Sequence, residues 1–271
     1  MKNLLIITGN TFPVFGSFAI ALLACASLFL MGAVHQVQGQ EKNAKKTVVL
    51  VHGAFADGSS WEKIIPFLQK QGLNVVAVQN PLSSLADDVA AAKRAIEAAP
   101  GEVILVGHSW GGAVITQAGV DPKVSALVYV AAYAPDKKQS TNETQKDYPK
   151  PEWLGAVNVD SGGFVTLKPE AVANFFAQDL PAAQTSVMAV TQGPSAAKCF
   201  DEKLTETAWS SKPSWYIVAG NDRMIPPDLE RFFAKKINAK TTVLPTSHVP
   251  MLSKPKEVAD VILAAAGVAK K

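Results

Sequence analysis

Short runs of apolar residues alternate with segments of helical periodicity from residue 47 onward. Several of these runs lack polar alternation, a pattern typical of strands that helices cover on both faces. Strands and helices in regular succession predict crossover units and a parallel sheet. We expect six strands, over residues 47–51, 74–78, 102–106, 124–131, 214–219 and 241–244.

Between the expected strands, apolar residues recur at helical spacing. In the segment 85–99, Leu85, Val89, Ala92 and Ile96 fall on one face and charged residues on the others. The sequence therefore predicts an α/β fold, with a mostly parallel six-stranded sheet and helices on both faces. Further helices are expected over residues 61–71, 113–119, 227–237 and 255–266.

One long segment interrupts this succession. Residues 135–212 are rich in Pro, Gly, Ser and Thr, contain no convincing strand, and show one helical stretch at 169–178. A structureless loop of this length is uncommon in a compact domain, so we expect a small, mainly helical cap over the carboxyl edge of the sheet. Residues 40–134 and 213–271 then form the core.

The first 39 residues differ in composition from the rest. Lys2 is the only charged residue before Glu41, the segment 12–34 is almost wholly apolar, and Gly39 closes a peptidase-like site. We interpret residues 1–39 as a signal peptide, which implies a periplasmic or secreted protein without stable membrane association. Two alternatives stay open, an uncleaved membrane anchor and a lipoprotein site at Cys25.

Charge and cysteine content exclude some classes of partner and bond. Without the leader, 25 basic residues stand against 23 acidic ones, a balance that does not indicate a nucleic-acid partner. Cys25 leaves with the leader, which makes Cys199 single and excludes an intramolecular disulfide. We expect Cys199 to be a buried small apolar residue or a free thiol. Nothing in the composition indicates the oligomeric state.

A candidate nucleophile follows the third expected strand. Residues 107–112 read Gly-His-Ser-Trp-Gly-Gly, with an apolar run before them and a helical stretch after them. A serine between glycines at this spacing sits on a tight strand-to-helix turn that exposes its hydroxyl. The motif alone is weak evidence because glycine and serine are common. Its context makes Ser109 the candidate.

A serine hydroxyl needs a base at neutral pH, normally a histidine. Of the four histidines, His35 lies in the leader and His108 adjoins Ser109 too closely in sequence. His52 ends the first strand, where its ring is expected to bond nearby loop backbone. His248 follows the last strand and can reach the same sheet edge as Ser109, so it is the candidate base.

The base in turn needs an acid to fix its tautomer. Asp222, after the fifth strand, is the candidate; Asp136, after the fourth, is the alternative, although Pro-Asp is also common in turns. The developing oxyanion requires N–H donors, for which we assign the main chain of Trp110 and Ala54. This chemistry needs no metal or cofactor.

Four segments together resemble the α/β-hydrolases, namely residues 49–54, 107–112, the loop 218–226 and residues 247–255. They are similar to the branch that holds bacterial esterases, plant methyl esterases and plant hydroxynitrile lyases, and the resemblance covers the whole mature chain. It implies a triad and an oxyanion hole formed by Ser109, Asp222, His248, Ala54 and Trp110.

Two positions separate the chemistries of that branch. The lyases carry a threonine at Gly53 and, at Val249, the lysine that cyanide release needs. The resemblance thus implies a serine hydrolase that opens small to medium, partly apolar carboxylic esters through an acyl-enzyme. A ligand-binding protein without turnover is the rival class. Aromatic residues available for the substrate pocket, or alternatively for the core of the cap, are Trp110, Trp153, Phe164, Phe175 and Phe176.

Overall fold

The computed structural model describes residues 45–268. The signal peptide expected over residues 1–39 lies outside the described residues, together with its anchor and lipoprotein alternatives. Within residues 45–268, no helix is long and apolar enough to cross a bilayer.

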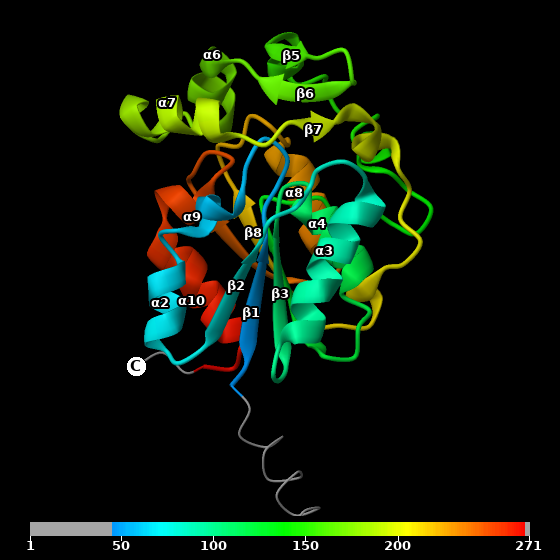
Figure 1. Ribbon diagram of the computed structural model, residues 1–271, viewed down its shortest axis with the longest axis vertical. Helices are drawn as coiled ribbons and strands as arrows, with labels where there is room; N and C mark the ends of the chain where they lie inside the picture. Colours follow the sequence, from blue (N-terminus) through cyan, green and yellow to red (C-terminus); the bar gives the residue numbers. More distant parts are fainter. Residues whose placement is uncertain (1–44, 269–271) are drawn as a thin grey trace, which may run out of the picture. The chain divides into compact units, whose positions relative to one another are not determined.

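A six-stranded sheet forms the centre of the described chain, in the order β2-β1-β3-β4-β8-β9 (Figure 1). All of its pairings are parallel, as predicted, and β1 and β3 are buried along their whole length. Every expected strand is confirmed to within two residues at each end. The strands are β1 (Thr47–Val51), β2 (Asn74–Val78), β3 (Val103–His108), β4 (Val124–Val130), β8 (Ser214–Ala219) and β9 (Lys240–Leu244).

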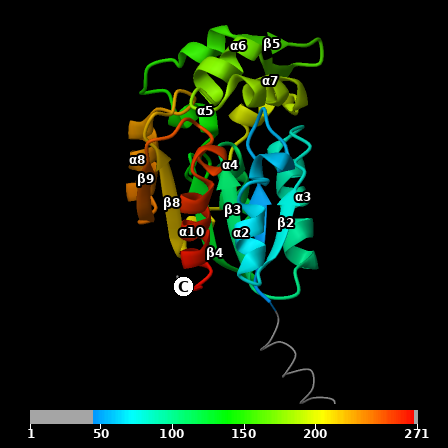
Figure 2. The ribbon, with the colours of Figure 1, turned by 90° about the vertical axis from the view of Figure 1, so that its left-hand side faces the viewer.

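Helices cover both faces of the sheet, as expected (Figures 1 and 2). On one face lie α2 (Ile65–Lys70) and α10 (Pro255–Ala265), and on the other α3 (Leu85–Ala98) and α4 (Gly111–Ala118). The Ser84 side chain caps α3 by accepting a hydrogen bond from the N–H of Asp87, and the predicted apolar face of this helix is buried. The remaining core helices are η1 (Gly58–Trp61), α8 (Pro227–Lys236) and α9 (Pro250–Ser253).

A cap lies over the carboxyl ends of the strands (Figure 1). The expectation that it holds no strand was wrong, because a three-stranded antiparallel sheet, β5-β6-β7, runs through it. These strands have two to four residues each, too few to leave a periodic pattern. The cap elements are α5 (Thr141–Thr144), η2 (Glu152–Gly155), β5 (Val157–Val159), β6 (Phe164–Leu167), α6 (Pro169–Ala171), the π-helix η3 (Val172–Phe176), α7 (Ala182–Thr191), β7 (Ser195–Ala196), η4 (Ala197–Asp201) and η5 (Ala208–Ser210).

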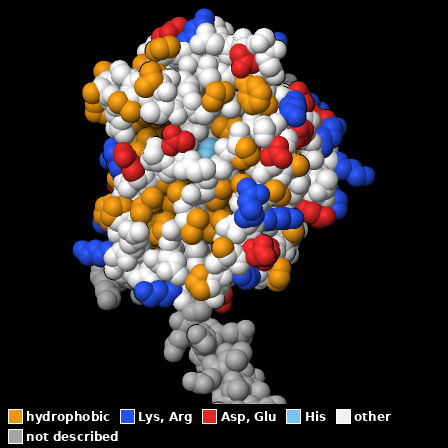
Figure 3. Space-filling view, viewed as in Figure 1, with side chains coloured by type: hydrophobic (Ala, Val, Ile, Leu, Met, Phe, Trp, Pro, Cys, Tyr) orange, Lys and Arg blue, Asp and Glu red, His pale blue; other side chains and the backbone are white. Residues whose placement is uncertain are grey.

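The cap helix α7 was also missed. It follows Pro181, and its Val187 and Val190 are exposed, so its apolar residues do not gather on one buried face. Hydrophobic side chains are visible at the outer edge of the cap, where this helix lies (Figure 3). Cys199, in the short helix η4, is buried and has no disulfide partner within residues 45–268, and burial raises the pKa of its thiol to about 12.

Candidate active site

Ser109 occupies a strained turn between β3 and α4. Its φ of +52° lies in the left-handed region, which non-glycine residues seldom adopt. The turn is possible because its flanking residues lack side chains: a Cβ at Gly107 would lie 2.5 Å from the carbonyl oxygen of Gly111, and one at Gly111 would lie 2.4 Å from that of Val51. The sequence motif therefore folds into the predicted elbow.

The sheet register brings four functional loops to one edge. Val51 pairs with Gly107, so the loop after β1 and the elbow after β3 begin side by side. Ala219 pairs with Leu244, and the loops after β8 and β9 likewise start together. Because the strands are parallel, all four loops emerge beneath the cap. The strand order reverses at β1, which has β2 on one side and β3 on the other. In open α/β sheets, ligands bind outside the carboxyl ends of the strands at such a point.

His248 and Asp222 meet in this region. Nδ1–H of His248 donates to Oδ2 of Asp222 over 2.5 Å, and both side chains are almost completely buried. The other carboxylate oxygen of Asp222 accepts the N–H groups of Met224 and Ile225, at 2.6 and 3.0 Å. The carboxylate is thereby fixed by three donors, and it leaves Nε2 of His248 as the ring atom available to a hydroxyl.

The alternative acid, Asp136, lies elsewhere. Its carboxylate pairs with Lys236 at 3.1 Å and is half exposed, while its carbonyl accepts the N–H of Gln139 in a turn. Asp136 is thus the surface turn residue that the Pro-Asp sequence also suggested. The structure places Asp222, and not Asp136, against His248.

The two other described histidines support the loops around the site. His52 behaves as expected, since its Nδ1–H donates to the Gly53 carbonyl at 2.8 Å and its Nε2 accepts the N–H of Asn80 at 2.9 Å. His108 was considered only as a base, but its Nε2–H donates to the carbonyl of His248 at 2.7 Å. Burial lowers the pKa of both rings, which keeps them neutral at physiological pH.

The two expected oxyanion donors are free to bind a ligand. Within residues 45–268, the main-chain N–H groups of Ala54 and Trp110 have no hydrogen-bond acceptor. Backbone N–H groups are seldom left unpaired in a folded protein unless a ligand or water takes them up. Gly53 allows the main chain of the loop after β1 to lie close to Ser109, because a Cβ at Gly53 would be only 2.7 Å from Cβ of Ser109.

The Trp110 side chain has an anchor that sequence reasoning missed. Its indole N–H donates to Oδ2 of Asp88 in α3 at 2.7 Å, and Oδ1 of Asp88 accepts the N–H of Leu82 at 2.8 Å. Asp88 is fully buried, and burial raises the pKa of its carboxyl to about 6 against the lowering effect of these two hydrogen bonds. The elbow is therefore tied to α3 through a buried carboxyl group.

The family profile of the α/β-hydrolases matches residues 48–261. The chain belongs to this family. Methylesterase 3 of Arabidopsis thaliana is 28% identical to it over 263 residues, which cover 82% of this chain and 97% of the relative. A probable hydrolase of a Phoma species is 29% identical over 251 residues, covering 83% and 99%. The crystal structure of polyneuridine aldehyde esterase shares the fold, with a TM-score of 0.71 at 22% identity over 82% of this chain and 99% of that one.

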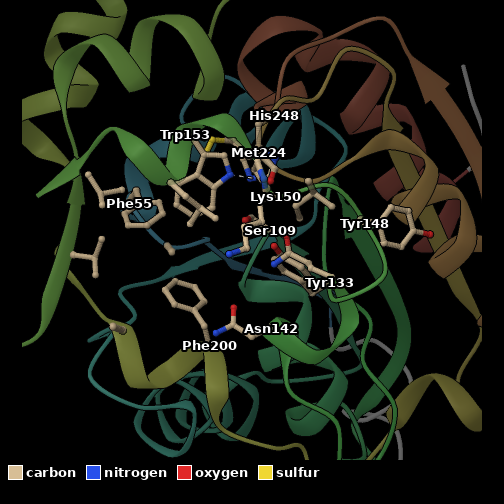
Figure 4. Close-up of a pocket in the computed structure, with 18 of the residues that line it drawn as sticks. Phe55, Ser109, Tyr133, Asn142, Tyr148, Lys150, Trp153, Phe200, Met224 and His248 are labelled. Carbon is tan, nitrogen blue, oxygen red and sulfur yellow. Dashed lines mark hydrogen bonds between the residues drawn. The ribbon is translucent and has the colours of Figure 1, made fainter. Parts of the chain in front are cut away.

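In this α/β-hydrolase a cavity of about 450 Å³ lies between the cap and the strand ends (Figure 4). Ser109, His248 and Ala54 line it. Of the aromatic residues expected there, Trp153 and Phe176 are lining residues, but Trp110, Phe164 and Phe175 are not. The Trp110 indole faces the core because Asp88 holds it there. Further lining residues, which the sequence did not indicate, include Phe55, Tyr133, Tyr148, Phe200 and Met224.

The cap of the hydrolase is hydrogen-bonded to the loops that carry Asp222 and His248. The Gln178 amide donates to the carbonyl of Asn221 at 2.7 Å. The Asp179 carboxylate accepts the N–H of Ser247 at 2.8 Å and the hydroxyl of Ser253 at 2.9 Å. Two consecutive cap residues, Gln178 and Asp179, thus hold the residues that directly precede Asp222 and His248.

Proposed function

We propose that this protein hydrolyses carboxylic esters through an acyl-enzyme formed on Ser109. The observation that carries the proposal is the buried 2.5 Å hydrogen bond between His248 and Asp222, at a cavity that Ser109 also lines. A carboxylate held against Nδ1 keeps the histidine in the tautomer whose Nε2 accepts a proton from serine. The family match and the Arabidopsis methylesterase support the same reaction class.

The proposed reaction has two steps. Oγ of Ser109 attacks the ester carbonyl carbon while Nε2 of His248 takes the hydroxyl proton, and the N–H groups of Ala54 and Trp110 stabilise the oxyanion. The carbon–oxygen bond to the alcohol then breaks, and His248 returns the proton to the departing alcohol. In the second step water repeats the attack on the acyl-enzyme, releasing the acid and free Ser109.

The cavity favours small to medium, partly apolar esters. Phe55 packs edge-on against Trp153 at 5.9 Å between ring centroids and lies 6.3 Å from Phe200, which gives one wall an aromatic surface. The structure also weighs against the lyase alternative, since Gly53 has no space for the threonine that such enzymes carry there. The ester hydrolase remains the better match to these residues.

Active-site labelling separates the proposed hydrolase from a ligand-binding protein without turnover. We expect a fluorophosphonate to attach one group per chain, at Ser109, and nitrophenyl esters of short to medium acyl chains to be hydrolysed. Mass spectrometry of the labelled peptide identifies the serine. A chain that binds nitrophenyl esters but neither labels nor releases nitrophenol is a binding protein instead.

We also propose that residues 1–39 direct export, which their apolar composition supports. The N-terminal residue of the labelled chain recovered from the periplasm or the medium tests this. A chain that stays inside the cell and begins at residue 1 or 2 would contradict it.

Replacing Asp88 with asparagine is expected to weaken both the fold and the oxyanion hole. An amide has one acceptor oxygen, so either the Trp110 indole N–H or the Leu82 N–H loses its partner, at about 1–3 kcal/mol. The pKa of the Asp88 carboxyl is about 6 in the folded protein, above its value in the unfolded chain. Between these two pKa values the folded state therefore binds more protons than the unfolded state. The contribution of Asp88 to stability is therefore largest at low pH and is lost as pH rises through 6.

Urea unfolding at pH 5 and pH 8, together with kcat, measures the Asp88→Asn effect. The loss of unfolding free energy should be larger at pH 5, and kcat should fall. The neighbouring exposed Asp87 supplies the control, because its carboxylate accepts the hydroxyls of Ser83 and Ser84 and Asp87→Asn leaves the elbow contacts intact. Equal effects of the two substitutions would contradict the role assigned to Asp88.

A further inference from the structure

A second buried carboxyl group lies behind the His248–Asp222 pair. Glu230, in α8, is completely buried. Its Oε2 accepts the N–H of Ala219, the last residue of β8, at 3.0 Å. Its Oε1 is buried and meets no donor within residues 45–268. A buried polar atom without a partner is costly, so this oxygen requires an explanation.

The explanation lies in its neighbour. Glu230 and Asp222 both bond Ala219: Glu230 accepts its N–H, and the main-chain N–H of Asp222 donates to its carbonyl at 3.2 Å. The charge of Asp222 is also among the causes that raise the pKa of Glu230. Two ionised carboxylates held beside the same residue repel each other, and in a buried site only one of them keeps its charge. Asp222 already accepts three donors as a carboxylate, whereas Glu230 accepts one. The proton of the pair therefore belongs on Glu230.

We propose that Glu230 is a positioning residue of the active site, carrying a proton on Oε1 that it donates to the Asp222 carboxylate. This assignment satisfies both oxygens of Glu230, one as acceptor and one as donor. It extends the hydrogen-bonded pair of His248 and Asp222 by one further group. The kinetic consequences of this proposal rest on the proposed ester hydrolase function, whereas the protonation of Glu230 does not.

The surroundings of Glu230 favour the neutral form. Burial is the main cause that raises its pKa well above the ordinary value, and the charge of Asp222 adds to it. Tyr133, after β4, and Tyr216, in β8, add no negative charge to the surroundings of this carboxyl, since burial raises the pKa of both phenols. The cation nearest in sequence, Arg231, pairs with exposed Asp228 and opposes the shift only weakly.

The proton has a pH-dependent consequence. Because the folded-state pKa of Glu230 exceeds the unfolded value, its contribution to stability is present at low pH and declines as pH rises toward the folded pKa. Loss of the proton at alkaline pH would put two anions behind His248 and remove the hydrogen bond that orients Asp222. A glutamine in this position keeps an acceptor for Ala219 and a permanent donor for Asp222.

Three variants and two readouts test the proposal. Infrared difference spectra of wild type against Glu230→Gln at neutral pH should show a protonated carboxyl band only in wild type, whether or not the protein hydrolyses esters. We expect Glu230→Gln to keep kcat within about tenfold and to hold its kcat/KM to higher pH than wild type. Glu230→Leu should lose at least tenfold more than Glu230→Gln, and Asp228→Asn, on the same helix, should change neither readout.

These experiments test the protonated Glu230 and the ester hydrolase function separately. A missing carboxyl band in wild type, or coincident alkaline limbs for wild type and Glu230→Gln, overturns the protonated Glu230. Equal losses in folded Glu230→Gln and Glu230→Leu, checked by circular dichroism, overturn it as well. A wild-type protein that shows the band but hydrolyses no ester overturns the ester hydrolase and leaves the protonated carboxyl established.

Discussion

Replacing Ser109 with alanine is expected to lower kcat for nitrophenyl ester hydrolysis by about 10⁶-fold, the order seen when a serine hydrolase loses its nucleophile. Without Oγ no acyl-enzyme forms, and the remaining rate comes from the cavity and the two N–H donors at Ala54 and Trp110. The fold should persist, because alanine and serine meet the same steric cost at a φ of +52°. Steady-state kinetics and circular dichroism measure the two expectations.

A serine outside the site supplies the control for this experiment. Ser186 is exposed on α7, where the carbonyl of Ala182 is the one acceptor of its hydroxyl among the described residues 45–268. Ser186→Ala should leave kcat within about twofold of wild type, as surface substitutions away from a site usually do. If folded Ser109→Ala retained a tenth or more of the wild-type kcat, another group would have to be the nucleophile.

The core of the fold was predictable because its signals are local. The runs 48–51 and 103–106 are continuously apolar, and both lie in strands that are buried on two faces. A parallel sheet places all its carboxyl ends at one edge, so Ser109, Asp222 and His248 could be brought together from their positions after three strands. The contact between Asp222 and His248 then follows from the pairing of β8 with β9.

What the sequence did not reveal depends on contacts between distant residues. Asp88 appeared to be one of several charges on the polar face of α3, yet it bonds to an indole 22 residues away. Phe55 and Phe200 meet at the cavity from a core loop and from the end of the cap. The cap strands, of two to four residues, are held by their partners and not by their own composition. The spacing of apolar residues along the chain does not predict such contacts.

The groups that sequence reasoning missed share one arrangement. His108, Asp88 and Glu230 are buried polar side chains that bond the nucleophile elbow, the β8 end or the His248 loop, and none of them lines the cavity. Preorganised donors and acceptors stabilise a transition state only if their supports are rigid. We therefore expect this buried polar layer beneath the cavity to position the groups of the proposed active site, a role that the composition of each helix does not indicate.

Asp222→Asn is expected to lower kcat by about 10⁴-fold, because the structure dictates how the new amide must lie. The oxygen at the Oδ1 position accepts the N–H groups of Met224 and Ile225, so the amide oxygen has to remain there. The amide nitrogen then faces Nδ1 of His248 as a donor. His248 responds by placing its proton on Nε2, the atom that must accept the proton of Ser109.

The matched comparison is Asp136→Asn, the same change at the other acid considered for this role. Asp136 pairs with Lys236 at the surface, so its loss should alter kcat by less than about twofold. Kinetics of both variants, with folding checked by circular dichroism, distinguish the two assignments. A large loss in Asp136→Asn with a small loss in Asp222→Asn would mean that the acid is Asp136 and that the buried pair serves only the fold. The opposite result is expected, because Asp222, and not Asp136, bonds Nδ1 of His248 and so determines which nitrogen carries the proton.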